Sequence, residues 1–442
     1  MSINNSRDYI AYLETLFGGI VTDHLVAGRN IQLVSGTYTQ PDLPDFPNFD
    51  TVTFEGTARS DTLFGGGGEY AAFFLGTAGD DLYGAFIETG GLGFVDYSGA
   101  KGGVRVDLSY TGSRTFTDAD GEVRTVDIHG KARDGFGGTD YFADSSVYPG
   151  SGVYGFFGSS HRDVMIEDPE TEWGHEFYGG AGNDLLIGAV VQYGGDGNDR
   201  LVNYWEGYGE AGNDVLIGGW SHFGGAGDDR LVGRLAEDGY YADGGEGNDC
   251  LLGTGFIDWL IGGAGNDRIF AKGGDDPVVV GEAGNDYVDG GAGNDFIDGG
   301  VGRDVLVSGS GNDTINPDVE FFQVDPDRPT DGARDVVRVT RADLGDYTDV
   351  VLSRAFEAGL DEVRFAAALG GERFRVFQEA QSFGDDGALL RDDDLAGRVN
   401  TVLQIDADAD GLGSRAARDA DDYFLVVVDA DLSLNRAEWL LT

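Results

Sequence analysis

The sequence predicts an all-β fold, a parallel β-solenoid, on the basis of three observations. Between Gly179 and Asn316 the chain repeats the phrase Gly-Gly-x-Gly-x-Asp, each copy followed by an apolar triplet. Triplets such as Leu185–Ile187 carry an aliphatic residue at their centre, which is typical of a very short strand with one side chain in a core. The copies also return at fixed intervals, and a fixed period is the signature of a repeat architecture.

The repeated loop is suited to binding a hard cation. Glycine permits positive backbone dihedrals, so the loop can turn its carbonyl oxygens inward, and the Asp adds negative charge. Calcium is the best candidate because it takes about six to eight oxygen ligands, accepts backbone carbonyls and tolerates irregular geometry better than magnesium. The candidate metal-binding carboxylates are Asp184, Asp199, Asp214, Asp229, Asp249, Asp267, Asp286, Asp295, Asp304 and Asp313. The loop glycines expected around the same ions are Gly180, Gly182, Gly195, Gly197, Gly212, Gly225, Gly227, Gly245, Gly247, Gly263, Gly265, Gly284, Gly291, Gly293, Gly300, Gly302 and Gly311.

The spacing of the loops changes along the repeat. From Gly281 to Gly299 a loop begins every nine residues, so cation loops should line both sides of the solenoid there. From Gly179 to Gly224 a loop begins every fifteen residues, which indicates full coils with a cation loop on one side and a plain turn on the other. Residues 273–277 form a broken copy, and Pro277 argues against a normal paired strand at that point.

The nonapeptide Gly-Gly-x-Gly-x-Asp-x-U-x, with U aliphatic, resembles the RTX, or hemolysin-type, calcium-binding repeat of secreted bacterial proteins. This resemblance implies a right-handed parallel β-roll with calcium between the loops of successive coils, bound by loop carbonyls and the Asp. It also implies export by a type I secretion machinery that reads an uncleaved C-terminal signal. The fifteen-residue spacing departs from the usual nine and puts a second row of ions in doubt for the first half of the repeat.

The composition favours cations as partners. The chain has 442 residues, 76 of them Gly, and a formal net charge of −50. Such a chain repels nucleic acid and anionic membrane surfaces, and no apolar run approaches the length of a membrane span. Adaptation of the surface to salt would also explain acidity, but many of the Asp residues recur in register rather than scattered. Without ions the stacked carboxylates should repel one another, so we expect the calcium-free repeat to be largely disordered.

The cysteine content and the N-terminal residues indicate where in or outside the cell the protein acts. Cys250 is the single cysteine, so an internal disulfide cannot staple the chain, and a packed or surface thiol is expected there. The first residues lack the basic and long apolar regions of a cleaved secretory peptide. Micromolar or weaker calcium sites are useful where calcium is abundant. We therefore expect an extracellular or cell-surface protein that is exported without an N-terminal signal peptide.

Two regions precede the repeat domain of residues 176–317. In region 1–50, residues 6–17 read as an amphipathic helix that caps the first coil, or alternatively docks a partner. Region 51–175 reads as a degenerate β-solenoid with insertions. Its eroded loops include residues 76–81, whose Asp81 is a weaker candidate ligand, and residues 158–163. Residues 94–108 resemble a strand pair that often lies beside such repeats.

Residues 318–442 predict a C-terminal β-rich domain with the secretion signal. β-like runs cover residues 336–340, 373–377, 401–405 and 423–428, and a helical tail is expected over residues 435–441. Asp406, Asp408 and Asp410 copy the opening of an EF-hand loop, but its twelfth position is Ala417 rather than Glu. These three residues are weaker candidate ligands, and a solvated acidic turn is the alternative.

The sequence offers no catalytic residue. It contains no Gly-x-Ser-x-Gly elbow, no His-Glu-x-x-His and no phosphate loop of the Walker type. Acidic pairs occur everywhere, so no glycosidase-like pair of carboxylates stands out. Aromatic residues directly precede four of the loops, and repetition in register predicts stacked ladders that stabilise neighbouring coils. A ladder that faces solvent would alternatively bind sugar rings. The aromatic residues are Tyr178, Tyr193, Tyr208 and Phe223.

Two functions from different classes follow. The first is a non-enzymatic structural protein, folded by calcium after export, in a surface layer, an extracellular matrix or an adhesive assembly. Its partners would be calcium, the secretion machinery, and further copies of itself or a cell-surface glycan. The alternative is an extracellular polysaccharide-active enzyme or a carbohydrate-binding module built on residues 50–175.

Overall fold

The computed structural model describes residues 32–33, 50–55, 58–60, 62–65, 70–85, 93–117, 123–143, 153–167, 174–234, 239–316, 335–339, 348–351, 362–365, 374–379, 382–383, 389–390, 400–405, 423–427 and 440–441. The chain divides into two compact units, residues 1–214 and residues 215–442. Over the described ranges the chain forms strands and turns without a helix, so the predicted all-β class is confirmed. The predicted helix over residues 6–17 and the acidic loop over residues 406–411 lie outside these ranges.

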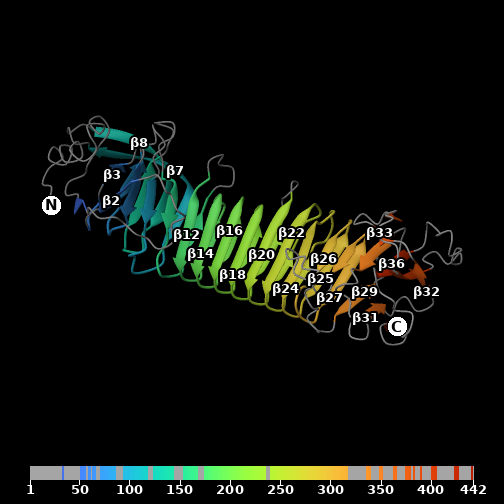
Figure 1. Ribbon diagram of the computed structural model, residues 1–442. Coiled ribbons are helices and arrows are strands. Elements are labelled where there is room, and N and C mark those ends of the chain that lie inside the picture. Colours follow the sequence, from blue (N-terminus) through green and yellow to red (C-terminus); the bar gives the residue numbers. More distant parts are fainter. Residues whose placement is uncertain are drawn as a thin grey trace. The chain divides into compact units, whose positions relative to one another are not determined.

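The first unit is built from parallel coils (Figure 1). Strand β12 (Glu176–Ala181) pairs in parallel with β14 (Val191–Asp196), which pairs in the same way with β16 (Glu206–Ala211). A second row runs from β13 (Leu185–Ile187) to β15 (Arg200–Asn203). Partner residues in these pairs are fifteen positions apart. Each fifteen-residue repeat therefore makes one coil with a strand on each side, which is a parallel β-solenoid.

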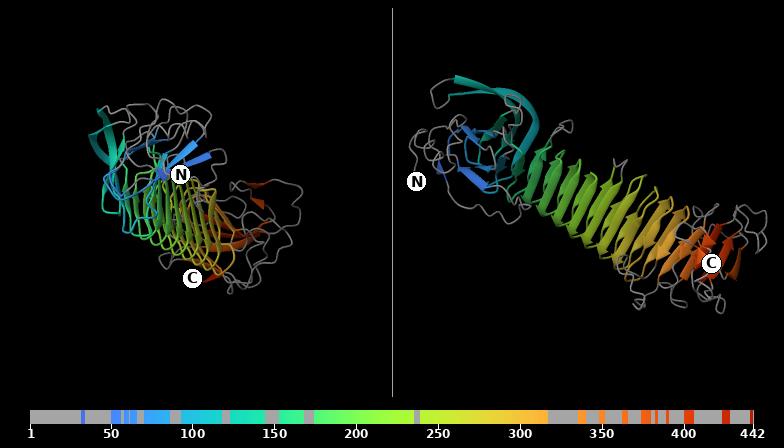
Figure 2. Two further views of the ribbon diagram at one scale, coloured as in Figure 1. Left: turned by 90° about the vertical axis from the view of Figure 1, so that its left-hand side faces the viewer. Right: turned by 45° about the horizontal axis from the view of Figure 1, so that its top comes forward.

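The same pairing continues towards the N-terminus of this unit. Strand β6 (Gly93–Asp96) pairs with β10 (Gly155–Phe157), while β7 (Arg105–Thr117) pairs with β11 (Val164–Ile166). The strands predicted over residues 94–108 thus form, but in different rows of the solenoid. Figure 2 shows the long antiparallel ribbon of β7 with β8 (Val123–Arg133), which stands out from the coils. The remaining strands are β1 (Gln32–Leu33), β2 (Asp50–Glu55), β3 (Thr62–Gly65), β4 (Tyr70–Leu75), β5 (Leu82–Ala85) and β9 (Thr139–Ala143).

The second unit has longer coils. The first pairing, Val215 with Arg230, still spans fifteen positions. From Ser221 to Ser310, partner residues on neighbouring coils lie eighteen to twenty positions apart, which leaves room for two nine-residue repeats in a coil. One row of strands contains β17 (Val215–Gly218), β19 (Arg230–Gly233), β21 (Cys250–Leu252), β23 (Arg268–Phe270), β25 (Tyr287–Ala292) and β27 (Val305–Ser310). The other row contains β18 (Ser221–Ala226), β20 (Tyr240–Glu246), β22 (Asp258–Ala264), β24 (Val278–Ala283), β26 (Phe296–Asp298) and β28 (Thr314–Asn316). Strand β24 begins directly after Pro277, so this proline delays the paired strand without preventing it.

The four β-like runs predicted near the C-terminus correspond to β29 (Val336–Val339), β32 (Phe374–Glu379), β35 (Asn400–Ile405) and β36 (Tyr423–Val427). The helix predicted over residues 435–441 is wrong at its described end. There β37 (Leu440–Leu441) pairs in parallel with β31 (Glu362–Phe365), because backbone pairing to a solenoid strand replaces the bonds of a helical turn. The remaining strands are β30 (Thr348–Val351), β33 (Ser382–Phe383) and β34 (Leu389–Leu390).

The core is a stack of the central triplet residues. Leu186 and Leu201 in the first unit, and Leu251 and Ile269 in the second, are fully buried between the two rows of strands. Burying an aliphatic side chain of this size contributes about 1.5–3 kcal/mol, so every coil adds its own share of the core. In the part of the chain that the structure describes, no helix is long and apolar enough to span a bilayer.

Aromatic rings form a second stack in the first unit. The ring of Tyr193 lies 4.7 Å from that of Tyr178 and 4.8 Å from that of Tyr208, and both pairs are nearly parallel. Phe157 extends the stack at 4.4 Å from Tyr178. The predicted ladder of rings before the loops is confirmed for Tyr178, Tyr193 and Tyr208, and Phe157 is an additional member.

Candidate metal centre

Each candidate loop follows a strand and turns on glycines with positive φ. In the loop of residues 179–184, Gly180 has φ of +94° and Gly182 has φ of +152°. L-residues rarely adopt this region, which explains why glycine recurs at these two places. Positive φ also occurs at Gly195, Gly197, Gly212, Gly225, Gly227, Gly245, Gly247, Gly263, Gly265, Gly284, Gly291, Gly293, Gly300, Gly302 and Gly311.

The Asp residues of the first unit form one column. The backbone N–H of Asp163 donates to Oδ1 of Asp184, that of Asp184 to Oδ1 of Asp199, and that of Asp199 to Oδ1 of Asp214, each at 2.7 Å. All four residues are buried. The column places one carboxylate at the same point of each of these four coils, on one side of the solenoid.

The second unit carries two such columns, one on each side. In each column an Asp N–H donates to the carboxylate of the next coil at 2.7–3.0 Å. The nine-residue spacing therefore does place loops on both sides. The first column contains Asp229, Asp249, Asp267, Asp286, Asp304 and Asp335, and the second contains Asp258, Asp276, Asp295 and Asp313.

The second carboxylate oxygen of these residues faces a space lined by backbone carbonyls. A methyl group built at Gly194 would lie 2.5 Å from Oδ2 of Asp199 and 2.8 Å from the carbonyl oxygen of Gly209. At Gly262 the corresponding distances are 2.6 Å to Asp267 and 2.8 Å to the carbonyl oxygen of the next loop. Carboxylate and carbonyl oxygens are the ligands that calcium prefers, so the donor set fits this ion.

Several of these oxygens lack a hydrogen-bond donor. Within the described ranges, Oδ2 is buried and accepts no hydrogen bond in Asp184, Asp199, Asp249, Asp267, Asp276 and Asp286. An unpaired buried carboxylate oxygen is strongly unfavourable unless a cation compensates it. The same feature in loop after loop is therefore an observation of this structure that favours bound cations.

The pKa values of the column carboxylates also show that their charged form is unfavourable without a cation. Burial, reinforced by the charges of Asp163 and Asp199, raises the pKa of Asp184 to about 7, although a backbone N–H opposes the rise. Burial and the charge of Asp295 raise the pKa of Asp276 to about 8. A divalent cation between the carboxylates would favour their charged form and reverse these shifts.

All ten Asp residues predicted as principal ligands lie in the three columns. Asp163, Asp258, Asp276 and Asp335 complete these columns but were not predicted as ligands, although Asp163 and Asp276 lie in the eroded loop 158–163 and the broken copy 273–277. Asp258 and Asp276 lie nine residues on either side of Asp267. This spacing is the signal that could have identified them, although Thr254 and Ala271 replace glycines of the motif in their loops.

The weaker candidates behave differently. The N–H of Asp81 donates to Asp140 at 3.1 Å, as in the columns, but Oδ2 of Asp81 accepts the hydroxyls of Thr77 and Tyr83. Asp406, Asp408 and Asp410 lie outside the described residues. Among the described residues, His, Cys, Asp and Glu side chains do not form groups of three that could hold a metal ion by themselves. In the loops, each carboxylate is instead accompanied by backbone carbonyls.

Comparison with known proteins agrees with this geometry. The family model described as the RTX calcium-binding nonapeptide repeat, in four copies, matches residues 53–69, 176–189, 208–222, 223–240, 243–276 and 280–315. No curated protein matches the chain significantly. The matched residues contain loops of all three columns, and RTX repeats bind several calcium ions.

Proposed function

We propose that this chain, which carries RTX calcium-binding repeats, leaves the cell before its repeats fold and folds outside when calcium enters the loops. The observation that carries the proposal is the set of buried carboxylates whose Oδ2 atoms face carbonyls and accept no hydrogen bond, such as those of Asp184 and Asp267. Without calcium these charges repel, and ordering the glycine-rich loops costs entropy. Calcium supplies the missing interaction where it is abundant, which is outside the cell.

The role that we propose is structural and non-enzymatic, in a surface layer, matrix or adhesive assembly. An exposed apolar surface on the second unit supports contact with further copies. Trp220, Phe256, Ile257 and Trp259 are 37–48% exposed there. Strands β18, β20 and β22, which follow or contain the two Trp residues, are paired in sequence across neighbouring coils. Exposed apolar residues on neighbouring coils are typical of interaction surfaces.

A calcium titration of the full chain tests the folding step. Circular dichroism should show a gain of β structure as calcium rises, and EGTA should reverse it. Magnesium at the same concentration serves as the matched control and should produce much less structure. A chain that is equally ordered after exhaustive removal of calcium would contradict the proposal.

Electron microscopy and light scattering of the calcium-saturated sample test the assembly step. Filaments or lattices that disappear on chelation would support a structural role. The double variant Trp220→Ser/Trp259→Ser should assemble less while it folds normally with calcium. A calcium-loaded wild type that stays monomeric at high concentration would count against assembly, while calcium-driven folding would stand.

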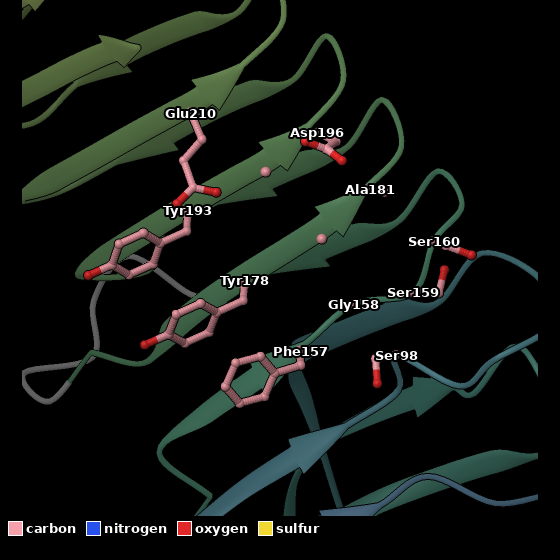
Figure 3. A pocket seen from close by; sticks show the side chains of 12 residues that line it. Ser98, Phe157, Gly158, Ser159, Ser160, Tyr178, Ala181, Tyr193, Asp196 and Glu210 are labelled. Carbon is pink, nitrogen blue, oxygen red and sulfur yellow. The ribbon is translucent and has the colours of Figure 1, made fainter. Parts of the chain in front are cut away.

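Binding of a glycan is a second candidate function, favoured by a groove in the first unit. The groove has a volume of about 300 Å³, and Phe157, Tyr178 and Tyr193 line one side of it with their rings in a row (Figure 3). Asp196 and Glu210 also line it and could accept hydrogen bonds from sugar hydroxyls. Aromatic rings beside hydrogen-bonding groups are suited to sugar recognition.

A glycan microarray with the calcium-loaded chain tests this second function. Binding that falls at least about tenfold, or by about 1.4 kcal/mol, in Asp196→Asn and Glu210→Gln would support it. Asp127→Asn, an exposed acid on the ribbon strand β8, is the control and should bind as the wild type does. Absence of binding to any neutral or acidic polysaccharide would reject it.

A further inference from the structure

The second position of each loop exists in two backbone forms. Where glycine stands there, φ is close to +100°, as at Gly195, Gly245 and Gly263. In two loops, residues 158–163 and residues 253–258, the second residue is Ser159 or Thr254, and neither has positive φ. The peptide before the second residue is therefore oriented differently in these two loops.

In these two loops the second residue caps the carboxylate. The N–H of Ser159 donates to Oδ2 of Asp163 at 2.5 Å, and its hydroxyl donates to Oδ1 at 2.9 Å. Thr254 makes the same two bonds to Asp258, at 2.6 and 2.9 Å. Both Asp residues are fully buried. Their oxygens thus have donors from their own loop, unlike the Oδ2 of Asp199 or Asp267.

The capping donors use carboxylate lone pairs that a cation would otherwise coordinate. A calcium ligand must present its lone pairs to the ion, whereas an N–H or O–H donor brings a positively polarised hydrogen to them. In loop 253–258, Nζ of Lys272 also donates to the carbonyl oxygen of Gly253 at 2.6 Å. This ammonium group links the loop to the next one in its column. We propose that loops 158–163 and 253–258 hold no calcium, and that the residue at the second loop position decides which loops do.

Backbone form, rather than the absence of a side chain, separates the two classes. Glu210, Lys272 and Glu282 stand at the second position with φ of +72°, +77° and +72°. Oδ2 stays without a donor in Asp276 and Asp286, the carboxylates of the last two of these loops. Loop 271–276, which overlaps the broken copy at residues 273–277, therefore belongs to the open class. A hydroxyl at the second position recurs in Thr77, which donates to Asp81 at 3.1 Å.

Calcium counting by native mass spectrometry of the full chain tests the proposal. Ser159→Gly and Thr254→Gly should each gain one ion relative to the wild type, because glycine can adopt the positive φ that opens the loop. The matched control is Ser160→Gly, at the exposed third position of the same loop as Ser159, which should keep the wild-type count. Unchanged counts in both second-position variants would overturn the proposal.

The reverse substitution provides a second measurement. In Gly263→Ser a side chain at positive φ would collide with the carbonyl oxygen of Gly245, so the loop should turn to the capped form and lose one ion. A Gly263→Ser chain that retains every ion would speak against the proposal. The inference rests on calcium binding by the open loops, and the wild-type count measures that separately. A wild type without calcium would reject binding itself, whereas unchanged variants would reject only the assignment of capped loops.

Discussion

The backbone N–H of Asp184 donates a 2.7 Å hydrogen bond to Oδ1 of Asp199, one coil further along the chain. Oδ2 of the same Asp199 is buried beside the Gly209 carbonyl and accepts no hydrogen bond within the described residues. One oxygen of the carboxylate therefore holds the preceding coil, while the other is left for a cation. Coil pairing and metal binding use the same side chain, so metal binding should change the stability of the coil pairing.

Stability without calcium should rise as the pH falls. The folded-state pKa values of Asp184, Asp214 and Asp267 are raised to about 7 by burial, above an ordinary value of about 3.9. Groups with raised pKa values contribute stability that is complete below about pH 4 and is lost as the pH rises to about 7. Circular dichroism of the metal-free chain should show more β structure at pH 5 than at pH 8.

Calcium should reverse this dependence, because protons and calcium compete for the same carboxylates. At a fixed, limiting calcium concentration the chain should be more ordered at pH 8 than at pH 5. Light scattering at both pH values controls for aggregation near the isoelectric point. A metal-free chain whose β content is the same at both pH values would refute the assignment of raised pKa values.

Asp199→Asn should remove one calcium site. Asn keeps the shape of the side chain but not its charge, and burial raises the pKa of Asp199 to about 6, so the charged form is unfavourable without metal. We expect one ion fewer in native mass spectra and at least about a tenfold loss of affinity, equivalent to about 1.4 kcal/mol. Metal-free stability should not fall. Asp196→Asn, an exposed acid in the same loop, should leave the ion count unchanged.

Gly197→Ala should destabilise the first unit. Gly197 has φ of +139°, and a methyl group there would collide with the carbonyl oxygen of Gly182 on the neighbouring coil. We expect a loss of about 2–4 kcal/mol in urea unfolding with saturating calcium. Gly255→Ala is the matched control, since a methyl group there meets no atom within 4 Å, and it should change stability by less than about 0.5 kcal/mol. Equal effects of the two changes would contradict the loop geometry.

Tyr193→Ala should weaken the first unit by about 1–3 kcal/mol, because it removes two stacked contacts in the middle of the aromatic ladder. The midpoint of thermal unfolding in calcium measures the effect. Tyr204→Ala removes a ring that is 54% exposed and should lower the midpoint far less. If the two variants had the same midpoint of thermal unfolding, the stack would not stabilise the coils.

The fold could be predicted from the sequence because its determinants are local and repeated. The triplet around Leu186 and the loop around Asp184 recur in register, and the register alone specifies parallel coils. The change from fifteen to nine residues also predicted one column of carboxylates before two. Four strands beyond residue 335 were found from their β-branched and aromatic runs.

What escaped prediction depends on neighbours in space. Asp335 continues a column from a segment outside the repeat, and no local motif marks it. Asp258 was hidden because Thr254 and Phe256 replace two glycines, although the hydroxyl and N–H of Thr254 hold the carboxylate in the same place. The terminal residues Leu440–Leu441 suit a helix locally, but their partner strand β31 lies nearly eighty residues away in the chain.

The Asp columns have a further consequence for how order spreads through each unit. An ion at one loop fixes a carboxylate that also anchors the coil before it, so loading one position makes the adjacent one easier to fill. Calcium binding should therefore proceed from one loop to the adjacent loop of the same column. The bound fraction in a calcium titration should then rise more steeply than independent sites allow, so that folding occurs over a narrow range of calcium concentration.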